Sequence, residues 1–112
     1  MGKIRIGILG AGRGIDLAQN FMLIDNCEVV ALCEINEKRA KAGLKRLGKE
    51  LPVFADFDEF LEQDLDAVAL ANFFHEHTPY AIKCFEKNKR KNSVNVKHYF
   101  LIFTLPLTLL VL

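Results

Sequence analysis

The sequence predicts an α/β fold built on a doubly wound parallel sheet, and three observations lead to this class. Over roughly the first ninety residues, short apolar segments alternate with segments whose apolar residues recur at helical spacing. A glycine-rich turn joins the first apolar segment to the first helical one. The length of 112 residues limits the chain to one domain at most. Strands separated by helices imply right-handed crossovers, and these place the strands in parallel with helices on both faces.

The four expected strands are short apolar segments, and each is followed by an expected helix. The strands are expected at residues 3–9, 28–33, 52–55 and 66–71, and the helices at residues 14–24, 36–50, 56–63 and 77–89. Asn36 is expected to cap the second helix, and the third begins behind Asp56. The side chains expected to face the sheet from the helices are apolar, namely Leu17, Phe21, Ile24, Ala40, Leu44, Leu47, Tyr80, Ala81, Cys84 and Phe85.

The composition is that of an ordinary globular protein. The chain is 51% hydrophobic and 26% charged, with a net charge of +1, which argues against a disordered chain and against a nucleic-acid partner. Cys27, Cys33 and Cys84 show no metal-site spacing, and we interpret them as reduced, mostly buried thiols of a cytoplasmic protein. No signal peptide is recognised, because Asp16 interrupts the first apolar stretch too early.

Three glycines mark the turn between the first strand and the first helix. Gly10 allows a tight turn, and Gly12 allows the backbone to approach a phosphate without a Cβ in the way. The N-terminus of the following helix adds a partial positive charge. The pattern G-x-G-x-x-G would place its third glycine at position 15, where this chain has Ile15, and Gly14 comes one residue early. The alternative is plain turn chemistry without a ligand.

An acidic residue follows the second strand, where a dinucleotide site needs one. Glu34 comes directly after the apolar segment 28–33, and a carboxylate there accepts hydrogen bonds from the adenosine ribose. Because it would also repel a 2′-phosphate, NAD is favoured over NADP. Arg13 is placed to contact a phosphate oxygen. The alternatives are a solvated loop position for Glu34 and an ordinary surface position for Arg13.

Residues 3–89 resemble the N-terminal half of the glucose–fructose oxidoreductase / inositol dehydrogenase (Gfo/Idh/MocA) family, which implies a Rossmann-like, NAD-binding domain. The resemblance lies in the glycine turn, in Glu34, in the segment Asp66–Val68, and in the loop "NFFHEH", whose last histidine, His77, matches the family while its start departs from the usual T-P-N. In the family this loop passes beside the cofactor. The implied cofactor-binding residues are Gly10, Ala11, Gly12, Arg13, Gly14, Ile15, Glu34, Asn72, Phe73 and His77.

Neither a metal site nor a catalytic residue is assigned from the sequence. His75 and His77 form an H-x-H pair, but no third ligand is evident, and residues two apart do not share one face of a helix. We therefore expect His77 to pack or to form hydrogen bonds in the first turn of its helix.

The resemblance stops after Lys89. The family continues there with a strand of the form H-V-L-x-E-K-P, whose lysine is central to catalysis, and with a C-terminal α/β domain that holds the substrate. This chain instead has an apolar tail. The expected division is a dinucleotide-binding domain at 1–89 and an atypical tail at 90–112, read as a truncated or out-of-frame end. A substitute strand from "SVNV" or "YFLIF" and a short membrane anchor are the alternatives, and the anchor is disfavoured by its length and by Pro106.

The resemblance implies NAD(H) binding by the cofactor-binding part of an NAD(P)-dependent oxidoreductase. Such an enzyme acts on sugar or polyol CH–OH groups, and the substrate partner is expected only in a full-length relative. We expect this chain alone to be inactive, because the catalytic lysine segment and the substrate domain are not recognised in it. The alternatives are a non-catalytic nucleotide-binding or regulatory module and a small tail-anchored protein.

Overall fold

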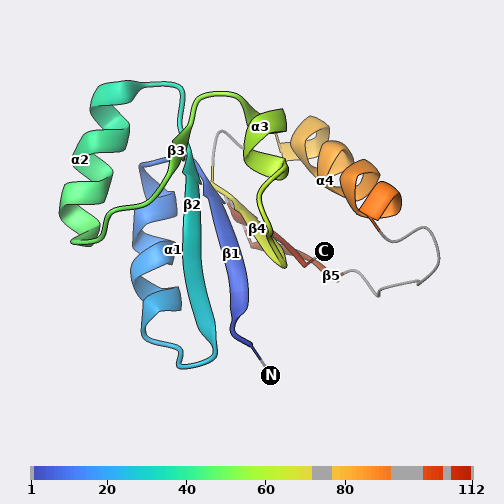
Figure 1. The fold of residues 1–112 in the computed structure, drawn as a ribbon, viewed down its shortest axis with the longest axis horizontal. Helices are drawn as coiled ribbons and strands as arrows, with labels where there is room; N and C mark the ends of the chain where they lie inside the picture. Colours follow the sequence, from blue (N-terminus) through green and yellow to red (C-terminus); the bar gives the residue numbers. More distant parts are fainter. Residues whose placement is uncertain (1, 72–76, 92–99, 105–106, 112) are drawn as a thin grey trace.

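The computed structural model describes residues 2–71, 77–91, 100–104 and 107–111. Helices and strands alternate along this part of the chain until the last two strands, as Figure 1 shows. The elements are β1 (Ile4–Leu9), α1 (Arg13–Met22), β2 (Cys27–Cys33), α2 (Glu37–Leu47), β3 (Val53–Phe54), α3 (Phe57–Leu61), β4 (Ala67–Leu70), α4 (His77–Lys91), β5 (Phe100–Thr104) and β6 (Leu107–Val111).

The strands form one sheet in the order β3-β2-β1-β4-β6-β5. The first four strands pair in parallel, which confirms the predicted α/β class and the doubly wound parallel sheet. β6 joins the free edge of β4 in the antiparallel direction, and β5 pairs antiparallel with β6. The strand pairing therefore changes from parallel to antiparallel between β4 and β6.

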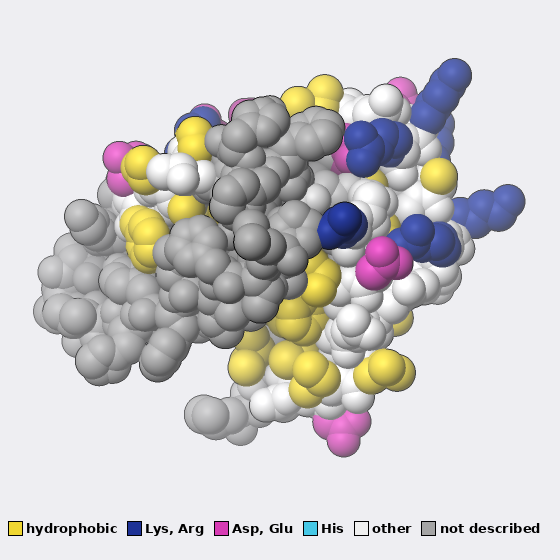
Figure 2. All heavy atoms as spheres, turned by 180° about the vertical axis from the view of Figure 1, so that it is seen from behind, with side chains coloured by type: hydrophobic (Ala, Val, Ile, Leu, Met, Phe, Trp, Pro, Cys, Tyr) yellow, Lys and Arg dark blue, Asp and Glu magenta, His cyan; other side chains and the backbone are white. Residues whose placement is uncertain are grey.

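Helices cover the two faces of the sheet in pairs. α1 and α2 lie on one face, whereas α3 and α4 lie on the other (Figure 1). The residues with the least exposed side chains come from both layers, and Ile8, Ile15, Leu32, Leu70 and Phe60 are among them. On its outer side α2 carries Lys and Arg side chains, which project from that part of the surface in Figure 2.

Local signals set the ends of the helices. The Asn36 side chain accepts the N–H of Arg39, and the Asp56 side chain accepts the N–H of Asp58, so both expected helix starts are confirmed. α2 ends at Gly48, whose φ of 73° is the left-handed cap that glycine favours. α1 ends earlier than expected, at Met22, and Ile24 is therefore 46% exposed and not part of the core.

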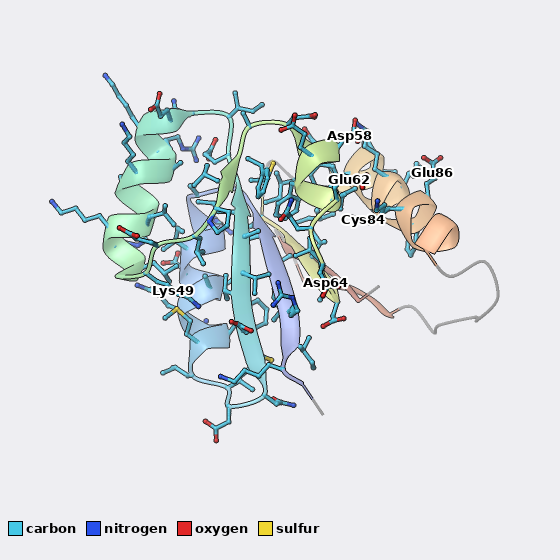
Figure 3. All side chains as sticks on the ribbon, viewed as in Figure 1. Lys49, Asp58, Glu62, Asp64, Cys84 and Glu86 are labelled. Atoms are coloured by element: carbon cyan, nitrogen blue, oxygen red, sulfur yellow. The ribbon has the colours of Figure 1, made fainter. Side chains whose placement is uncertain are left out.

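Ion pairs join α3 to α4 on the second face. Lys83 Nζ lies 3.3 Å from Asp58 Oδ1, and Lys87 Nζ lies 2.7 Å from Glu62 Oε2. Figure 3 shows Asp58 and Glu62 beside α4, which also carries Cys84. Cys84 is fully buried in the core between α4 and the sheet, as the inward face of this helix predicts.

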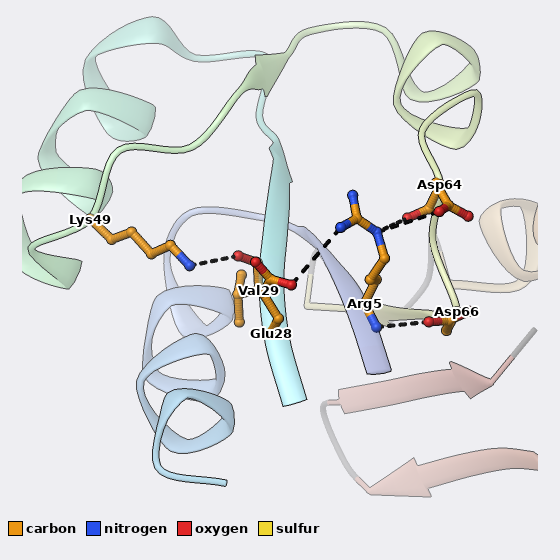
Figure 4. A network of polar contacts seen from close by, with 6 residues as sticks. All are labelled: Arg5, Glu28, Val29, Lys49, Asp64 and Asp66. Atoms are coloured by element: carbon orange, nitrogen blue, oxygen red, sulfur yellow. Dashed lines mark hydrogen bonds and ion pairs between the residues drawn. The ribbon is translucent and has the colours of Figure 1, made fainter. Parts of the chain in front are cut away.

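Arg5 holds together the amino ends of the central strands (Figure 4). Its Nε donates to the Asp64 carbonyl at 2.8 Å, and its N–H donates to Asp66 Oδ2 at 2.9 Å. Its guanidinium also lies 3.9 Å from Glu28 Oε2 on β2. These contacts hold the segment that leads into β4 and thereby help to set the register of β4 against β1.

The edge of β4 that faces away from β1 is paired in the structure. Ala67 pairs with Val111 and Leu70 with Thr108, so the strand on this edge is Leu107–Val111. Residues 93–96, the "SVNV" alternative, lie outside the described residues. "YFLIF" overlaps β5, which is the outer strand. Among the described helices, none has both the length and the apolar character needed to cross a membrane.

Candidate functional site

The candidate site lies at the carboxyl edge of the parallel strands. The glycine turn, which we define as residues 10–14, follows β1, Glu34 follows β2, and Ala71 follows β4. In open parallel sheets, ligands bind just outside this edge, at the point where the connections that follow two neighbouring strands lead to opposite faces of the sheet. The fold therefore brings the glycine turn and Glu34, which are far apart in sequence, to one edge.

Gly10 makes the turn out of β1. Its φ of 103° lies in the range that a Cβ disfavours. Its N–H donates to the carbonyl of Cys33 at 2.9 Å, and the N–H of Ala71 donates to the carbonyl of Leu9 at 2.9 Å. The turn is thus bonded to the end of β2 on one side and to the end of β4 on the other.

Gly12 precedes α1 and leaves the amino end of that helix open. It provides no side-chain cap, and among the described residues a Cβ placed on it would meet only the Arg39 Nη2 atom within 4 Å, at 3.3 Å. The first N–H groups of a helix have no partner within the helix and carry a partial positive charge. The backbone at Gly12 is therefore accessible to an anionic group.

Gly14 has a different role, which is packing. A Cβ on Gly14 would lie 2.5 Å from Cγ2 of Ile8, so only glycine lets α1 approach β1 this closely. This is the contact that the third glycine of a dinucleotide turn provides, and here it comes one residue earlier. Ile15 is 1% exposed and packs in the core against α2, while its N–H donates to the carbonyl of Gly12 at 3.1 Å.

Glu34 connects the glycine turn to the start of α2. Its Oε1 accepts the N–H of Ala11 at 3.1 Å, and its Oε2 accepts the N–H of Asn36 at 3.0 Å. The Nε of Arg39 lies 3.7 Å from Oε1, and the Glu34 side chain is 12% exposed. Since each carboxylate oxygen has two lone pairs, one backbone bond to each leaves further acceptor capacity for a ligand hydroxyl.

One face of α2 rests on the glycine turn, a contact that the sequence did not predict. Arg39 reaches Gly12, Gly43 lies against Ile15 and the Ala11 carbonyl, and Arg46 donates to the Gly12 carbonyl at 3.5 Å. These three residues recur about one helical turn apart. The apolar periodicity pointed instead to Ala40, Leu44 and Leu47, of which Ala40 and Leu47 are buried and Leu44 is half-buried. A glycine between two arginines at helical spacing was the available signal.

The other predicted site residues are not gathered as closely. Arg13 is exposed at the start of α1. Asn72 and Phe73 lie outside the described residues, and His77 is described only as the first residue of α4. The structure therefore brings together Gly10, Ala11, Gly12 and Glu34, and adds Arg39 from α2. The cofactor roles of all these residues stay predictions.

The buried thiols are not candidates for nucleophilic chemistry. Burial, with smaller contributions from the Asp56 and Glu34 carboxylates, raises the pKa of Cys33 to about 12. Burial also raises the pKa of Cys84 to about 12. The reactive form of cysteine is the thiolate, which neither residue populates near neutral pH. Within the described ranges, no group of His, Cys, Asp and Glu residues is arranged to hold a metal ion.

Comparison with known proteins places this chain in a family. The family model described as an oxidoreductase family with an NAD-binding Rossmann fold (Gfo/Idh/MocA) matches residues 4–96. The chain is 31% identical over 88 residues to a myo-inositol 2-dehydrogenase of Thermotoga maritima, a match that covers 77% of this chain and 26% of the relative. It is 29% identical over 100 residues to a glycosyl hydrolase family 109 protein of Solibacter usitatus, covering 79% and 23%.

Solved structures give the same result. The apo scyllo-inositol dehydrogenase from Lactobacillus casei matches with a TM-score of 0.68 and 29% identity over 77% of this chain and 26% of that chain. The same enzyme with bound NAD(H) and scyllo-inositol gives 0.67 and 28%, covering 76% and 26%. The WlbA dehydrogenase from Bordetella pertussis, in complex with NADH and UDP-GlcNAcA, gives 0.69 and 27%, covering 77% and 26%. The chain spans about a quarter of the length of these relatives.

Proposed function

The chain belongs to the Gfo/Idh/MocA family of oxidoreductases as an NAD-binding Rossmann domain, and on this premise we propose that it binds NAD(H) in preference to NADP(H) at the carboxyl edge of its sheet. The observation that carries the proposal is the position of Glu34. This residue directly follows β2, and its carboxylate accepts the N–H of Ala11 in the glycine turn. In this proposal, the Glu34 side chain would lie where the adenosine ribose and the pyrophosphate of a dinucleotide meet.

The residues present fit a dinucleotide. Gly12 leaves open the space that a Cβ would fill, and α1 begins there without a side-chain cap. Gly12, Arg13 and Gly14 would hold the pyrophosphate, largely through backbone N–H groups. Gly10 and Ala11 would shape the turn around it, because their own N–H groups bond to Cys33 and Glu34. Glu34 would accept hydrogen bonds from the ribose hydroxyls. We also propose that Asn72, Phe73 and His77 line the site, as the resemblance implies. Ile15, whose side chain is buried, would support the turn from the core. When bound, NAD supplies the hydride acceptor.

The preference for NAD follows from charge. Two like unit charges about 4 Å apart repel by ~1 kcal/mol in water and ~4 kcal/mol near a protein surface, and a 2′-phosphate would face the Glu34 carboxylate. Arg39, with its Nε 3.7 Å from Glu34, offsets part of this repulsion. We therefore expect a preference for NADH over NADPH of about tenfold, which corresponds to ~1.4 kcal/mol.

A sugar or a polyol is the substrate class we propose for the whole enzyme. The support comes from relatives whose names specify inositol or a sugar nucleotide. None of the residues described here is assigned to binding that substrate or to catalysis. We propose that the present chain, by itself, binds the cofactor without transferring hydride.

Titration calorimetry with NADH and NADPH tests the cofactor assignment. Glu34→Ala removes the ribose acceptor together with the negative charge, and the preference for NADH should narrow to within about threefold. Because Glu34 also bonds to backbone N–H groups, Glu34→Gln provides a second variant that keeps the side-chain volume. The control is Glu37→Gln, which removes a carboxylate that is 82% exposed and paired with Lys41. Tighter binding of NADPH than of NADH by the unaltered chain would refute the role of Glu34.

A further inference from the structure

Arg46, on α2, reaches across to the glycine turn. Its Nη2 lies 2.6 Å from Oδ1 of Asp16 and donates to the carbonyl of Gly12 at 3.5 Å. The same carbonyl accepts the N–H of Ile15 at 3.1 Å. Two donors from different elements therefore hold this carbonyl in one direction.

The direction of that carbonyl decides where the next N–H points. The peptide bond is planar and trans, so the N–H of Arg13 is opposite to the carbonyl of Gly12. With the carbonyl held toward Arg46 and the body of α1, the N–H of Arg13 points out from the amino end of the helix. Gly12, with φ −84° and ψ −98°, lies outside the regular helical and extended regions and has no side chain to fix its peptide. A hydrogen bond from Arg46 to the carbonyl of Gly12 therefore also sets the direction of the Arg13 N–H.

Fold stability does not account for the Arg46–Asp16 pair. The two side chains are 50% and 66% exposed, and exposed ion pairs contribute about 0 to 1 kcal/mol to folding. The core contact between α1 and α2 is made elsewhere, by Gly43 against Ile15. The pair is therefore more important for orienting Arg46 than for holding the two helices together.

We propose that Arg46, oriented by Asp16, is a positioning residue for the dinucleotide, acting through the carbonyl of Gly12. This inference rests on the proposed NAD(H) binding at the same turn. Arg46 aligns the Arg13 N–H with the pyrophosphate before the cofactor arrives, so that the turn need not reorganise on binding.

Asp16→Asn distinguishes positioning from simple electrostatic attraction, because the two predict opposite signs. Removing a negative charge in the first turn of α1 should strengthen binding of an anionic cofactor if charge alone matters. If Asp16 acts by orienting Arg46, the same change should weaken NAD⁺ binding by about threefold to fivefold. Tighter binding or unchanged binding by Asp16→Asn would overturn the proposal.

Variants at Arg46 complete the test in calorimetric titrations of the full chain with NAD⁺. Arg46→Met keeps the apolar stem without the donor and should weaken binding by about fivefold, whereas Arg46→Lys keeps a cationic donor and should stay within about twofold of the unaltered chain. Lys41→Met is the matched control, because it removes a positive charge from α2 at a side chain that is 76% exposed and paired with Glu37. An equal loss of NAD⁺ affinity in Lys41→Met would mean that the effect comes from net charge alone, and it would overturn the proposal.

A binding experiment with adenosine separates positioning from a general loss of structure. Adenosine has no phosphate, so its NMR-detected affinity should be unchanged in Asp16→Asn and Arg46→Met, and the urea midpoints should match that of the unaltered chain. Weakened adenosine binding would mean that the variants disturb the whole site, which overturns the positioning role. If the unaltered chain fails to bind NAD⁺, the proposed function itself fails, and this outcome is distinct from a failure confined to the variants.

Discussion

Replacing Gly14 by alanine should destabilise the fold, because α1 lies too close to β1 to admit a methyl group. A Cβ at Gly14 would lie 2.5 Å from Cγ2 of Ile8 and 3.5 Å from Cβ of Ala71. Ile8 is 0% exposed and lies in a strand with neighbours on both sides. Because it is β-branched, its χ1 has few alternatives. The helix would have to move away from the sheet.

The size of the effect follows from two opposing contributions. Overpacking a core costs about 1–3 kcal/mol, whereas exchanging glycine for alanine inside a helix gains up to about 1 kcal/mol, and less in the first turn. The net loss should be about 1–2 kcal/mol. With a urea m-value of about 1–1.5 kcal/mol/M, the midpoint of unfolding followed by circular dichroism should fall by about 1 M.

Gly12→Ala is the matched comparison, since it adds the same methyl group two residues earlier. There the new Cβ would meet the flexible end of Arg39 at 3.3 Å, and the cost to stability should stay below about 1 kcal/mol. The methyl group would instead occupy the approach to the turn, so NADH affinity should fall more than about tenfold. An urea midpoint for Gly14→Ala within about 0.2 M of the unaltered chain would refute the packing argument.

Two further predictions concern the thiols and the chemistry. In the folded chain the pKa values of Cys33 and Cys84 are raised from 9.0 to about 12, so the unfolded chain releases these two protons at a lower pH than the folded chain. The free energy of unfolding should therefore fall as the pH rises from 9 toward 12, by up to about 1.4 kcal/mol per thiol per pH unit. Urea midpoints at pH 8, 9 and 10 should fall less in a Cys33→Ala/Cys84→Ala variant, and an equal fall in both proteins would count against this cause. In the second test, NADH absorbance followed with sugars, inositols and their oxidised forms should show no turnover, because none of the described residues is assigned as the acid or base that hydride transfer needs. Turnover that disappears in Gly12→Val would contradict the prediction.

The alternating part of the fold could be predicted because local signals agree with it. The strands lie at the apolar segments expected for them, although β3 and β4 are each two residues shorter than the expected 52–55 and 66–71. Asn36 and Asp56 cap helices where the sequence expects them. The inward positions Ala40, Leu47 and Cys84 are buried. The prediction was less accurate at the end of α1, where Ile24 fits the apolar periodicity but follows the last helical residue. Periodicity alone does not specify where a helix ends.

The site was predictable only as far as it depends on single segments. The glycine turn and Glu34 each follow an apolar strand, so their convergence at one edge of a parallel sheet follows from topology. The contacts of Arg39, Gly43 and Arg46 with the turn depend on how α2 packs beside α1, and the apolar pattern of α2 does not contain that information. The packing role of Gly14 likewise depends on a side chain of β1, Ile8.

The direction of β6 determines which of its residues can meet a ligand. A parallel strand delivers the residue after its last position to the carboxyl edge, as β1 does with Gly10 and β2 with Glu34. β6 runs the other way, so Thr108, near its beginning, pairs with Leu70 at that edge, and Val111, at its end, pairs with Ala67 at the opposite one. The start of β6 therefore lies at the same edge of the sheet as the glycine turn and Glu34, and its end lies at the opposite edge.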